Sequence, residues 1–156
     1  GLQAYRVAHA LWTENRPFPA KMLQNIVSRK FGMDIHPAAK IGHGLLIDHA
    51  TNIVIGETAI VGNNVSFLHG VTLGGTGNET GDRHPKIGNG VMLGAHAQLL
   101  GNIHIGDCAK IGAGAVVLCD VPPHTTYAGV PAVEVGHPTD DMPSFNMQQD
   151  FTRDCD

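Results

Sequence analysis

Residues 87–118 read IGNGVMLGAHAQLLGNIHIGDCAKIGAGAVVL, and they decide the fold because a large apolar residue returns at every sixth position. The same period runs from Ile35 to Val117, with a two-residue slip after Ile47 and a longer break after Leu73. The thirteen repeat positions are Ile35, Ile41, Ile47, Ile55, Val61, Phe67, Leu73, Ile87, Leu93, Leu99, Ile105, Ile111 and Val117. A fixed short period of this kind is typical of a solenoid, in which each repeat buries its apolar face against its neighbours.

The positions between these residues support the same prediction. Glycine directly follows eight of the apolar positions, and small or apolar side chains stand four residues after twelve of them. Each hexapeptide therefore supplies a short strand, one large inward side chain and a corner that glycine can turn. Three such sides close a triangular coil, and stacked coils pair their backbone groups. A sandwich or barrel needs strands of about five residues with turns every 8–12 residues, which a strict period of six fits poorly.

The chain divides into three parts. Residues 1–33 carry apolar side chains at helical spacing on either side of two prolines, which predicts a helical hairpin, the end of an α-helical N-terminal domain. Residues 34–133 form the predicted β-helix, from which the polar, glycine-rich segment 76–86 must leave as an extruded loop. Residues 134–156 carry six acidic side chains against one arginine and are expected to be a solvated, mobile tail.

Composition excludes several classes of protein. The net charge is −4, and lysine and arginine do not cluster, so no nucleic-acid surface is expected. There is no long apolar span and no signal-like start, so we expect a soluble, cytoplasmic protein that does not enter a membrane. The three cysteines form no CxxC pair, which favours reduced thiols.

Three of the ten histidines stand out: His49, His69 and His84. His49 follows Asp48 at the slip in the repeat, where a local irregularity would re-aim side chains. Asp34 lies fifteen residues earlier, close to the eighteen of a three-sided coil. If its carboxylate contacts His49, it would fix the imidazole tautomer and make His49 a general base for a hydroxyl. A surface histidine beside an aspartate explains the same residues.

The extruded loop supplies a second group of charged residues, Asp82, Arg83 and His84. An arginine binds a carboxylate in bidentate fashion, and an acidic group such as Asp48 can hold an ammonium. Together with a histidine base, these groups suffice to hold a small amino acid by its ends while its side chain is deprotonated. A charged loop in solvent is the alternative.

Several motifs follow one another in a fixed order over residues 2–136. They are GMDIHPAAKIG (32–42), IDHAT (47–51), VTLGGTG (71–77), GDRHPKIG (81–88), IGDCAKIGAGAVVL (105–118) and VPPHTTYAGVPA (121–132). In this series the chain resembles the serine O-acetyltransferases of the hexapeptide-repeat acyltransferase superfamily. The resemblance implies a left-handed β-helix, whereas β-crossovers are generally right-handed.

The resemblance also implies a reaction and its residues. The reaction is transfer of acetyl from acetyl-CoA to the hydroxyl of L-serine, the first step from serine to cysteine, by direct attack with a histidine base. The residues implied for catalysis are Asp34 and His49, with His49 as the base. Those implied to hold serine, or L-cysteine as an inhibitor, are Asp48, Arg83 and His84. Those implied to lie along coenzyme A are Gly74, Gly75, Thr76, Gly77, Ala95, Lys110 and Ala113. No tightly bound cofactor and no metal are implied, since acetyl-CoA is a co-substrate.

Active sites in this family lie between the subunits of a homotrimer, so Arg83 and His84 are expected to face His49 of another chain. Two trimers join into a hexamer through a longer N-terminal domain, of which only the last hairpin is expected here. The family's partner, O-acetylserine sulfhydrylase, binds a C-terminal isoleucine, whereas this chain ends Asp-Cys-Asp. Asn78 also stands where a lysine is common in the family.

Three other functions remain open. Another hexapeptide-repeat CoA acyltransferase, acting on a sugar or antibiotic hydroxyl, would also use one histidine at a coil edge. A β-helical carbonic anhydrase would need two histidines five positions apart as zinc ligands, and no two histidines here have that spacing. A purely structural β-helix would explain the repeats but leave the loop unexplained.

Overall fold

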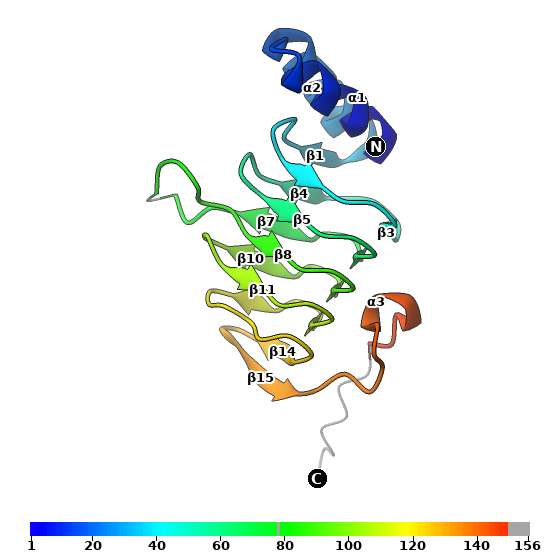
Figure 1. The fold of residues 1–156 in the computed structure, drawn as a ribbon, viewed down its shortest axis with the longest axis vertical. Coiled ribbons are helices and arrows are strands. Elements are labelled where there is room, and N and C mark those ends of the chain that lie inside the picture. The colour runs from blue at the N-terminus through cyan, green and yellow to red at the C-terminus, as the bar shows by residue number, and fades with distance from the viewer. Residues whose placement is uncertain (78, 150–156) are drawn as a thin grey trace.

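A computed structural model describes residues 1–77 and 79–149, which form a helical hairpin stacked on the end of a triangular β-helix (Figure 1). The hairpin consists of α1 (Leu2–Thr13) and α2 (Pro17–Phe31), and a short helix, α3 (Pro143–Asn146), follows the last strand. The predicted fold class, a β-helix of hexapeptide repeats preceded by a helical hairpin, is confirmed.

The β-helix has three faces, each made of strands from successive coils. Face A contains β1 (Met33–Ile35), β4 (Ile53–Ile55), β7 (Thr72–Gly74), β10 (Gln98–Leu100) and β13 (Val116–Val117). Face B contains β2 (Lys40–Ile41), β5 (Ile60–Val61), β8 (Lys86–Ile87) and β11 (His104–Ile105). Face C contains β3 (Leu46–Ile47), β6 (Ser66–Phe67), β9 (Met92–Leu93), β12 (Lys110–Ile111), β14 (Thr126–Gly129) and β15 (Ala132–Gly136). Strands pair in parallel, except that β15 returns antiparallel to β14 and closes the stack.

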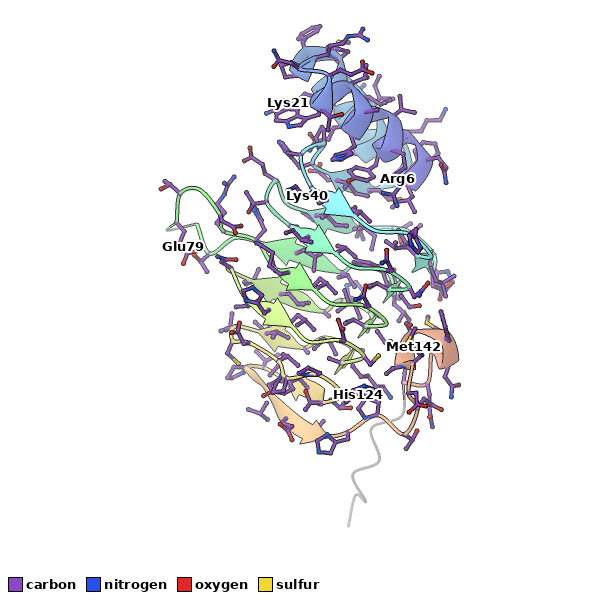
Figure 2. All side chains as sticks on the ribbon, viewed as in Figure 1. Arg6, Lys21, Lys40, Glu79, His124 and Met142 are labelled. Atoms are coloured by element: carbon purple, nitrogen blue, oxygen red, sulfur yellow. The ribbon has the colours of Figure 1, made fainter. Side chains whose placement is uncertain are left out.

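The strand register measures the length of each coil. Val54 pairs with Thr72, and Gln98 pairs with Val116, so both of these coils hold eighteen residues. Asp34 pairs with Val54, twenty residues later, because the coil between them carries the two-residue slip. Thr72 pairs with Gln98, twenty-six residues later, so eight residues are inserted into that coil. They leave the prism as the loop between β7 and β8, which projects to the side in Figure 1 and carries Glu79 near its tip in Figure 2.

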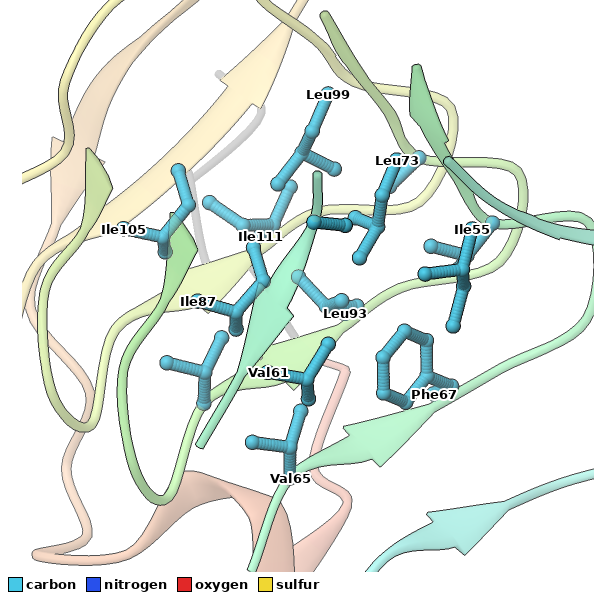
Figure 3. Close-up of a cluster of buried hydrophobic side chains, with 14 of the residues drawn as sticks. Ile55, Val61, Val65, Phe67, Leu73, Ile87, Leu93, Leu99, Ile105 and Ile111 are labelled. Atoms are coloured by element: carbon cyan, nitrogen blue, oxygen red, sulfur yellow. The ribbon is translucent and has the colours of Figure 1, made fainter. Parts of the chain in front are cut away.

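The apolar repeat positions fill the interior of the prism (Figure 3). Twelve of the thirteen are buried, and eleven of these twelve expose 3% or less of their surface. Burying a side chain of this size stabilises the fold by about 1.5–3 kcal/mol relative to leaving it in water. The one exception, Ile47, is partly buried and lies at the slip, where the neighbouring Thr51 is exposed. The core is therefore continuous except at the corner that precedes β4.

Glycine at the corners lets neighbouring coils approach closely. At Gly94, a Cβ atom would lie 2.5 Å from the backbone nitrogen of Ala113 and 2.7 Å from the carbonyl carbon of Gly112. Any larger residue would force the backbones of two coils apart, so the recurrent glycine reflects coil contact as well as turning.

The helical hairpin covers the first coil, whose strands would otherwise present unpaired edges. The buried Tyr5 donates its hydroxyl hydrogen to the carbonyl of Ala39 at 2.5 Å, and the guanidinium of Arg6 donates to the carbonyls of Ile41 and Gly42. Figure 2 shows Arg6 at this junction. α2 ends at Phe31 and is capped by Gly32, whose left-handed φ of 64° redirects the chain into β1.

The segment after β15 folds back beside face C (Figure 1). Ser66 donates its hydroxyl hydrogen to the carbonyl of Ser144 at 2.5 Å, and Pro143 and Ser144 are both buried. The expectation that the whole acidic tail is solvated is therefore wrong for these two residues, because face C offers them an apolar surface and a hydrogen-bond donor. Asn78 and residues 150–156 lie outside the described residues.

Replacing Leu99, which is fully buried, with alanine should lower the free energy of unfolding by about 2–5 kcal/mol, because the stacked coils cannot collapse around the cavity. The matched control is Leu118→Ala, since Leu118 is 55% exposed, and its effect should stay within about 0.5 kcal/mol. Urea unfolding at one fixed protein concentration measures both. Equal losses for the two variants would contradict the described core.

Candidate active site

The corner between faces C and A gathers an aspartate and three imidazoles, Asp48, His49, His69 and His96, which we call the histidine corner. The His49 Nε2 atom lies 3.5 Å from an Asp48 carboxylate oxygen. The ring centroids of His49 and His69 are 5.7 Å apart, and those of His69 and His96 are 4.8 Å apart, with interplanar angles of 87° in both pairs. The three rings therefore stack edge to face, one coil above the next.

The backbone of the histidine corner is unusual where the slip occurs. His49, Ala50 and Asn52 adopt left-handed φ values of 57°, 51° and 55°. Residues other than glycine rarely adopt this conformation, and when they cluster in it they often mark a functional site. The following coils place one left-handed residue at this corner, such as Gly70 and His96, whereas the coil with the slip places three. The His49 side chain is 70% exposed, so it can meet a molecule beyond its own chain.

Asp34 lies nearby on the outer side of face A. Its carboxylate accepts a hydrogen bond from Gln24 of α2 at 2.7 Å, and it lines a hollow of about 480 Å³ together with Asn52, Thr72 and His96. Asp34 therefore borders the histidine corner. Within residues 1–77 and 79–149, no hydrogen bond or ion pair joins Asp34 to His49 itself.

The corner between faces A and B holds a second cluster, Glu57, Thr58, Arg83 and His84, which we call the arginine corner. Arg83 Nη2 lies 2.7 Å from a Glu57 carboxylate oxygen. The backbone N–H groups of Arg83 and His84 both donate to Thr58 Oγ1, at 3.0 and 3.1 Å. The hydrogen bond from Arg83 lowers the pKa of Glu57. The C-terminal end of the loop is thus fastened to the coil beneath it.

His84 is held on all sides in this cluster. It is 8% exposed, and its Nδ1 atom lies 3.2 Å from the Thr58 backbone nitrogen and 2.9 Å from Thr58 Oγ1. Its ring covers Gly56, where a Cβ atom would come within 2.0 Å of the imidazole. Burial lowers the pKa of His84, and the charges of Arg83 and Lys86 lower it further. The imidazole is therefore neutral at pH 7.

Lys86 holds Asp82, the remaining charged residue of the loop, by a hydrogen bond. Its ammonium group donates to Asp82 at 2.7 Å, to the carbonyl of His84 at 2.5 Å and to Asn102 at 3.0 Å. Asp82 therefore pairs within the loop. The guanidinium of Arg83 is also held, by Glu57 and by the Gly81 carbonyl at 2.9 Å, but its side chain is 30% exposed and keeps further N–H groups for a ligand.

The two corners are separate in one chain. Each strand of face A runs from the corner that contains His49 to the corner that contains Arg83, so these side chains lie on different edges of the prism. The expectation that Arg83 and His84 meet His49 of a different chain stays a prediction, and this placement is what such sharing requires.

The residues predicted to contact coenzyme A also lie on different parts of the prism. Gly74, Gly75, Thr76 and Gly77 lead from β7 into the loop beside the arginine corner. Ala95 and Ala113 lie on successive coils of the histidine corner's edge, where Gly114 N–H donates to the Ala95 carbonyl at 2.7 Å. Lys110 is buried in β12 on face C.

Sequence reasoning missed Glu57 and Thr58 and gave no role to His69 or His96. The signal for Thr58 was available, because His84 follows it by twenty-six residues, which is one coil of eighteen plus the eight inserted residues. The stacking of the His49, His69 and His96 rings could be recognised only from the strand register, because His69 and His96 come from coils of different length.

No metal site or membrane span emerges from residues 1–77 and 79–149. No three histidine, cysteine, aspartate or glutamate side chains among them are grouped to hold a metal ion. None of their helices is long and apolar enough to cross a membrane.

Comparison with known proteins agrees with this architecture. The family model for the bacterial transferase hexapeptide (six repeats) matches residues 84–119. Serine acetyltransferase of Escherichia coli strain K12 is 63% identical over 150 residues, which are 96% of this chain and 55% of that protein. Serine acetyltransferase 4 of Arabidopsis thaliana is 58% identical over 98% of this chain and 43% of its own length. The chain thus spans about half the length of these relatives.

Solved structures of serine acetyltransferases are also similar to this chain. A serine acetyltransferase in complex with cysteine has a TM-score of 0.94 at 57% identity, over 97% of this chain and 59% of that one. The Brucella abortus serine acetyltransferase in complex with coenzyme A has a TM-score of 0.86 at 57% identity, over 87% and 54% of the two chains. The soybean serine acetyltransferase complexed with serine has a TM-score of 0.85 at 61% identity, over 86% and 55%.

The β-helix and its repeats are those of the hexapeptide-repeat class, whose family model matches residues 84–119. Within that class the chain is a relative of the serine acetyltransferases over nearly all of its length, as its motifs predicted.

The buried His84 should make stability fall in mild acid. Its folded-state pKa lies below the ordinary value of 6.5, so as the pH falls through about 6.5 the unfolded chain binds a proton that the folded chain does not. The free energy of unfolding from urea titrations should therefore decline between about pH 7 and pH 5.5, and His84→Gln should flatten that decline. His43→Gln, which alters an exposed imidazole, is the matched control and should keep the wild-type decline. An unchanged slope in His84→Gln would contradict the described burial.

Proposed function

We propose that this chain is the catalytic portion of a serine O-acetyltransferase, which transfers acetyl from acetyl-CoA to the hydroxyl of L-serine. The observation that carries the proposal is the division of complementary groups between two corners. An exposed imidazole beside a carboxylate lies at one, and a fastened arginine and a neutral histidine lie at the other. Relatives of at least 57% identity are described as complexed with serine and with coenzyme A, the two substrates of this reaction.

His49 acts as the general base. Its outward imidazole takes the hydroxyl proton of serine as the serine oxygen attacks the thioester carbonyl of acetyl-CoA. The tetrahedral intermediate then collapses, the carbon–sulfur bond breaks, and the thiolate of coenzyme A leaves and takes the proton from the imidazolium. Holding both substrates in attack geometry lowers the barrier without an acyl-enzyme. Asp34, which borders the histidine corner, completes the catalytic pair in this proposal.

The charged ends of serine meet groups from both corners. Arg83 binds the carboxylate, because a guanidinium pairs with a carboxylate in bidentate geometry, and the ion pair with Glu57 fixes its direction. Asp48, beside His49, binds the ammonium. A sugar carries neither charged end, so these residues favour an amino acid over a sugar or antibiotic acceptor.

A homotrimer brings the corners together. Face A separates His49 from Arg83 within one chain, so a complete site needs the histidine corner of one subunit against the arginine corner of its neighbour. Apolar side chains on all three faces support such contacts, since Val54 on face A, Ile60 on face B and Leu46 on face C are between 39% and 48% exposed. Coenzyme A would lie along the same seam, between the Gly74–Gly77 segment and the edge that carries Ala95 and Ala113.

Further assignments rest on the resemblance. L-cysteine would compete with serine for Asp48, Arg83 and His84, and one relative is described in complex with cysteine. Assembly into a hexamer, binding of a sulfhydrylase and a cytoplasmic location are proposed on the same basis.

An assay of free coenzyme A released from acetyl-CoA tests the activity. Release should depend on L-serine and should not be supported by glycine, which lacks the hydroxyl, or by a sugar. The variant His49→Gln should lower kcat by roughly 10²–10⁴, because it removes the base. His43→Gln, which changes an exposed imidazole on the edge between faces B and C, should keep the wild-type rate. Release that ignores serine would overturn the proposed function.

Mixing two inactive variants tests whether neighbouring chains share a site. His49→Gln removes the base from the histidine corner, and Arg83→Ala removes the guanidinium from the arginine corner. Each variant alone should therefore have little activity. When the two are unfolded together and refolded as mixed trimers, about one quarter of the shared sites receive both intact corners and activity should return in proportion. No recovery in demonstrably mixed trimers would mean that both residues serve a site within one chain.

A further inference from the structure

Thr58 makes three contacts at the base of the loop through one side-chain oxygen. Its Oγ1 atom lies 3.0 Å from the Arg83 backbone nitrogen, 3.1 Å from the His84 backbone nitrogen and 2.9 Å from His84 Nδ1. Its own backbone nitrogen lies 3.2 Å from the same Nδ1 atom. No other side chain in the arginine corner contacts both the backbone and the ring of His84.

Counting hydrogens assigns the tautomer of His84. A hydroxyl has two lone pairs and one hydrogen. The backbone N–H groups of Arg83 and His84 can only donate, so they occupy both lone pairs of the Thr58 oxygen. The hydroxyl hydrogen is then left for an acceptor, and it is shared between His84 Nδ1 and the Asp82 carboxylate. The Thr58 backbone N–H can only donate, and it donates to His84 Nδ1. Nδ1 must therefore carry a lone pair, and the hydrogen of the neutral ring lies on Nε2.

The residues around the His84 imidazole favour its neutral form and restrict its rotation. The ring rests on Gly56, which leaves no room for rotation toward the coil. Among the charged and titratable groups that face it, Arg83, Lys86 and His36 disfavour a second proton, whereas the carboxylates of Glu57 and Asp82 favour one. With burial added, the balance disfavours the imidazolium.

We propose that Thr58 is a positioning residue that locks His84 in the Nε2–H tautomer, so that His84 donates a hydrogen bond to the carboxylate of the substrate held by Arg83. The identity of that substrate rests on the proposed function. The tautomer does not, because it follows from hydrogen bonds within the chain. Without the Thr58 hydroxyl, only the Thr58 backbone N–H would still donate to Nδ1, at the longer distance of 3.2 Å. A fraction of the rings could then carry the hydrogen on Nδ1, and in those rings Nε2 would present a lone pair to a carboxylate and repel it.

Nitrogen-15 NMR of histidine-labelled protein above pH 7 tests the tautomer directly, with His84→Asn used to assign the His84 signals. The wild-type ring should give the pattern of a neutral imidazole protonated at Nε2. A signal from an Nδ1–H tautomer would overturn the proposal, whatever the enzyme does with serine.

Two variants connect the tautomer to binding. Thr58→Val keeps the shape of the side chain but removes the hydroxyl, and should give a mixture of tautomers and raise the KM for L-serine roughly two- to tenfold. Its kcat and its KM for acetyl-CoA should change less. Thr58→Ser keeps the hydroxyl and should restore the wild-type tautomer and KM.

The outcomes separate the two proposals. If the wild-type protein shows the Nε2–H tautomer but does not acetylate serine, the proposed function fails and the role of Thr58 in fixing the ring stands. If Thr58→Val keeps both the wild-type tautomer and the wild-type KM, the role of Thr58 fails and the proposed function stands. If Thr58→Val does not fold, Thr58→Ser decides, because a serine hydroxyl that left His84 in the Nδ1–H form would overturn the proposal.

Discussion

The parallel pairing of backbone groups between successive coils is the constraint on which the rest of this structure depends. Each strand must return above its predecessor in register, as shown by the hydrogen bonds from Asp48 N–H to the Phe67 carbonyl at 2.8 Å and from Gly56 N–H to the Leu73 carbonyl at 3.0 Å. Eighteen residues satisfy that requirement for a three-sided coil. Any additional residue must leave the prism at a corner, where backbone groups can reach water or side chains.

The residues of the proposed site lie at the two corners that hold these additional residues. Two of them lie at the corner before β4, where His49 and Ala50 both adopt left-handed conformations and the His49 imidazole is exposed. Eight of them at the corner after β7 form the loop that ends in Arg83 and His84. The rigid coils fix where each insertion begins and ends, and Thr58 and Lys86 fix its side chains. The separation of the two corners by face A then makes assembly part of the proposed mechanism, since neither corner alone holds both a base and a carboxylate-binding group.

The sequence predicted the parts of this structure that repeat. Leu73, Leu93 and Leu99 lie at the apolar period and are fully buried, and the segment that broke the period became the loop. The period could not predict which side chains meet across coils, because an insertion shifts every later residue relative to the earlier ones. Thr58 and His84 are twenty-six positions apart, so their contact appears only when the eight residues inserted between Leu73 and Ile87 are added to a coil of eighteen. The burial of Pro143 and Ser144 was also beyond the repeat, because it depends on the hydroxyl that Ser66 presents on face C.

The central claim is that one site is built from the two corners of neighbouring chains, and a crystal structure with L-serine and coenzyme A bound tests it most directly. The measured quantities are the distances from the serine hydroxyl to the nearest His49 imidazole and from the serine carboxylate to the nearest Arg83 guanidinium. We expect both to be hydrogen-bond distances, with His49 and Arg83 contributed by different subunits. Serine bound wholly within one chain, or away from His49, would contradict the account.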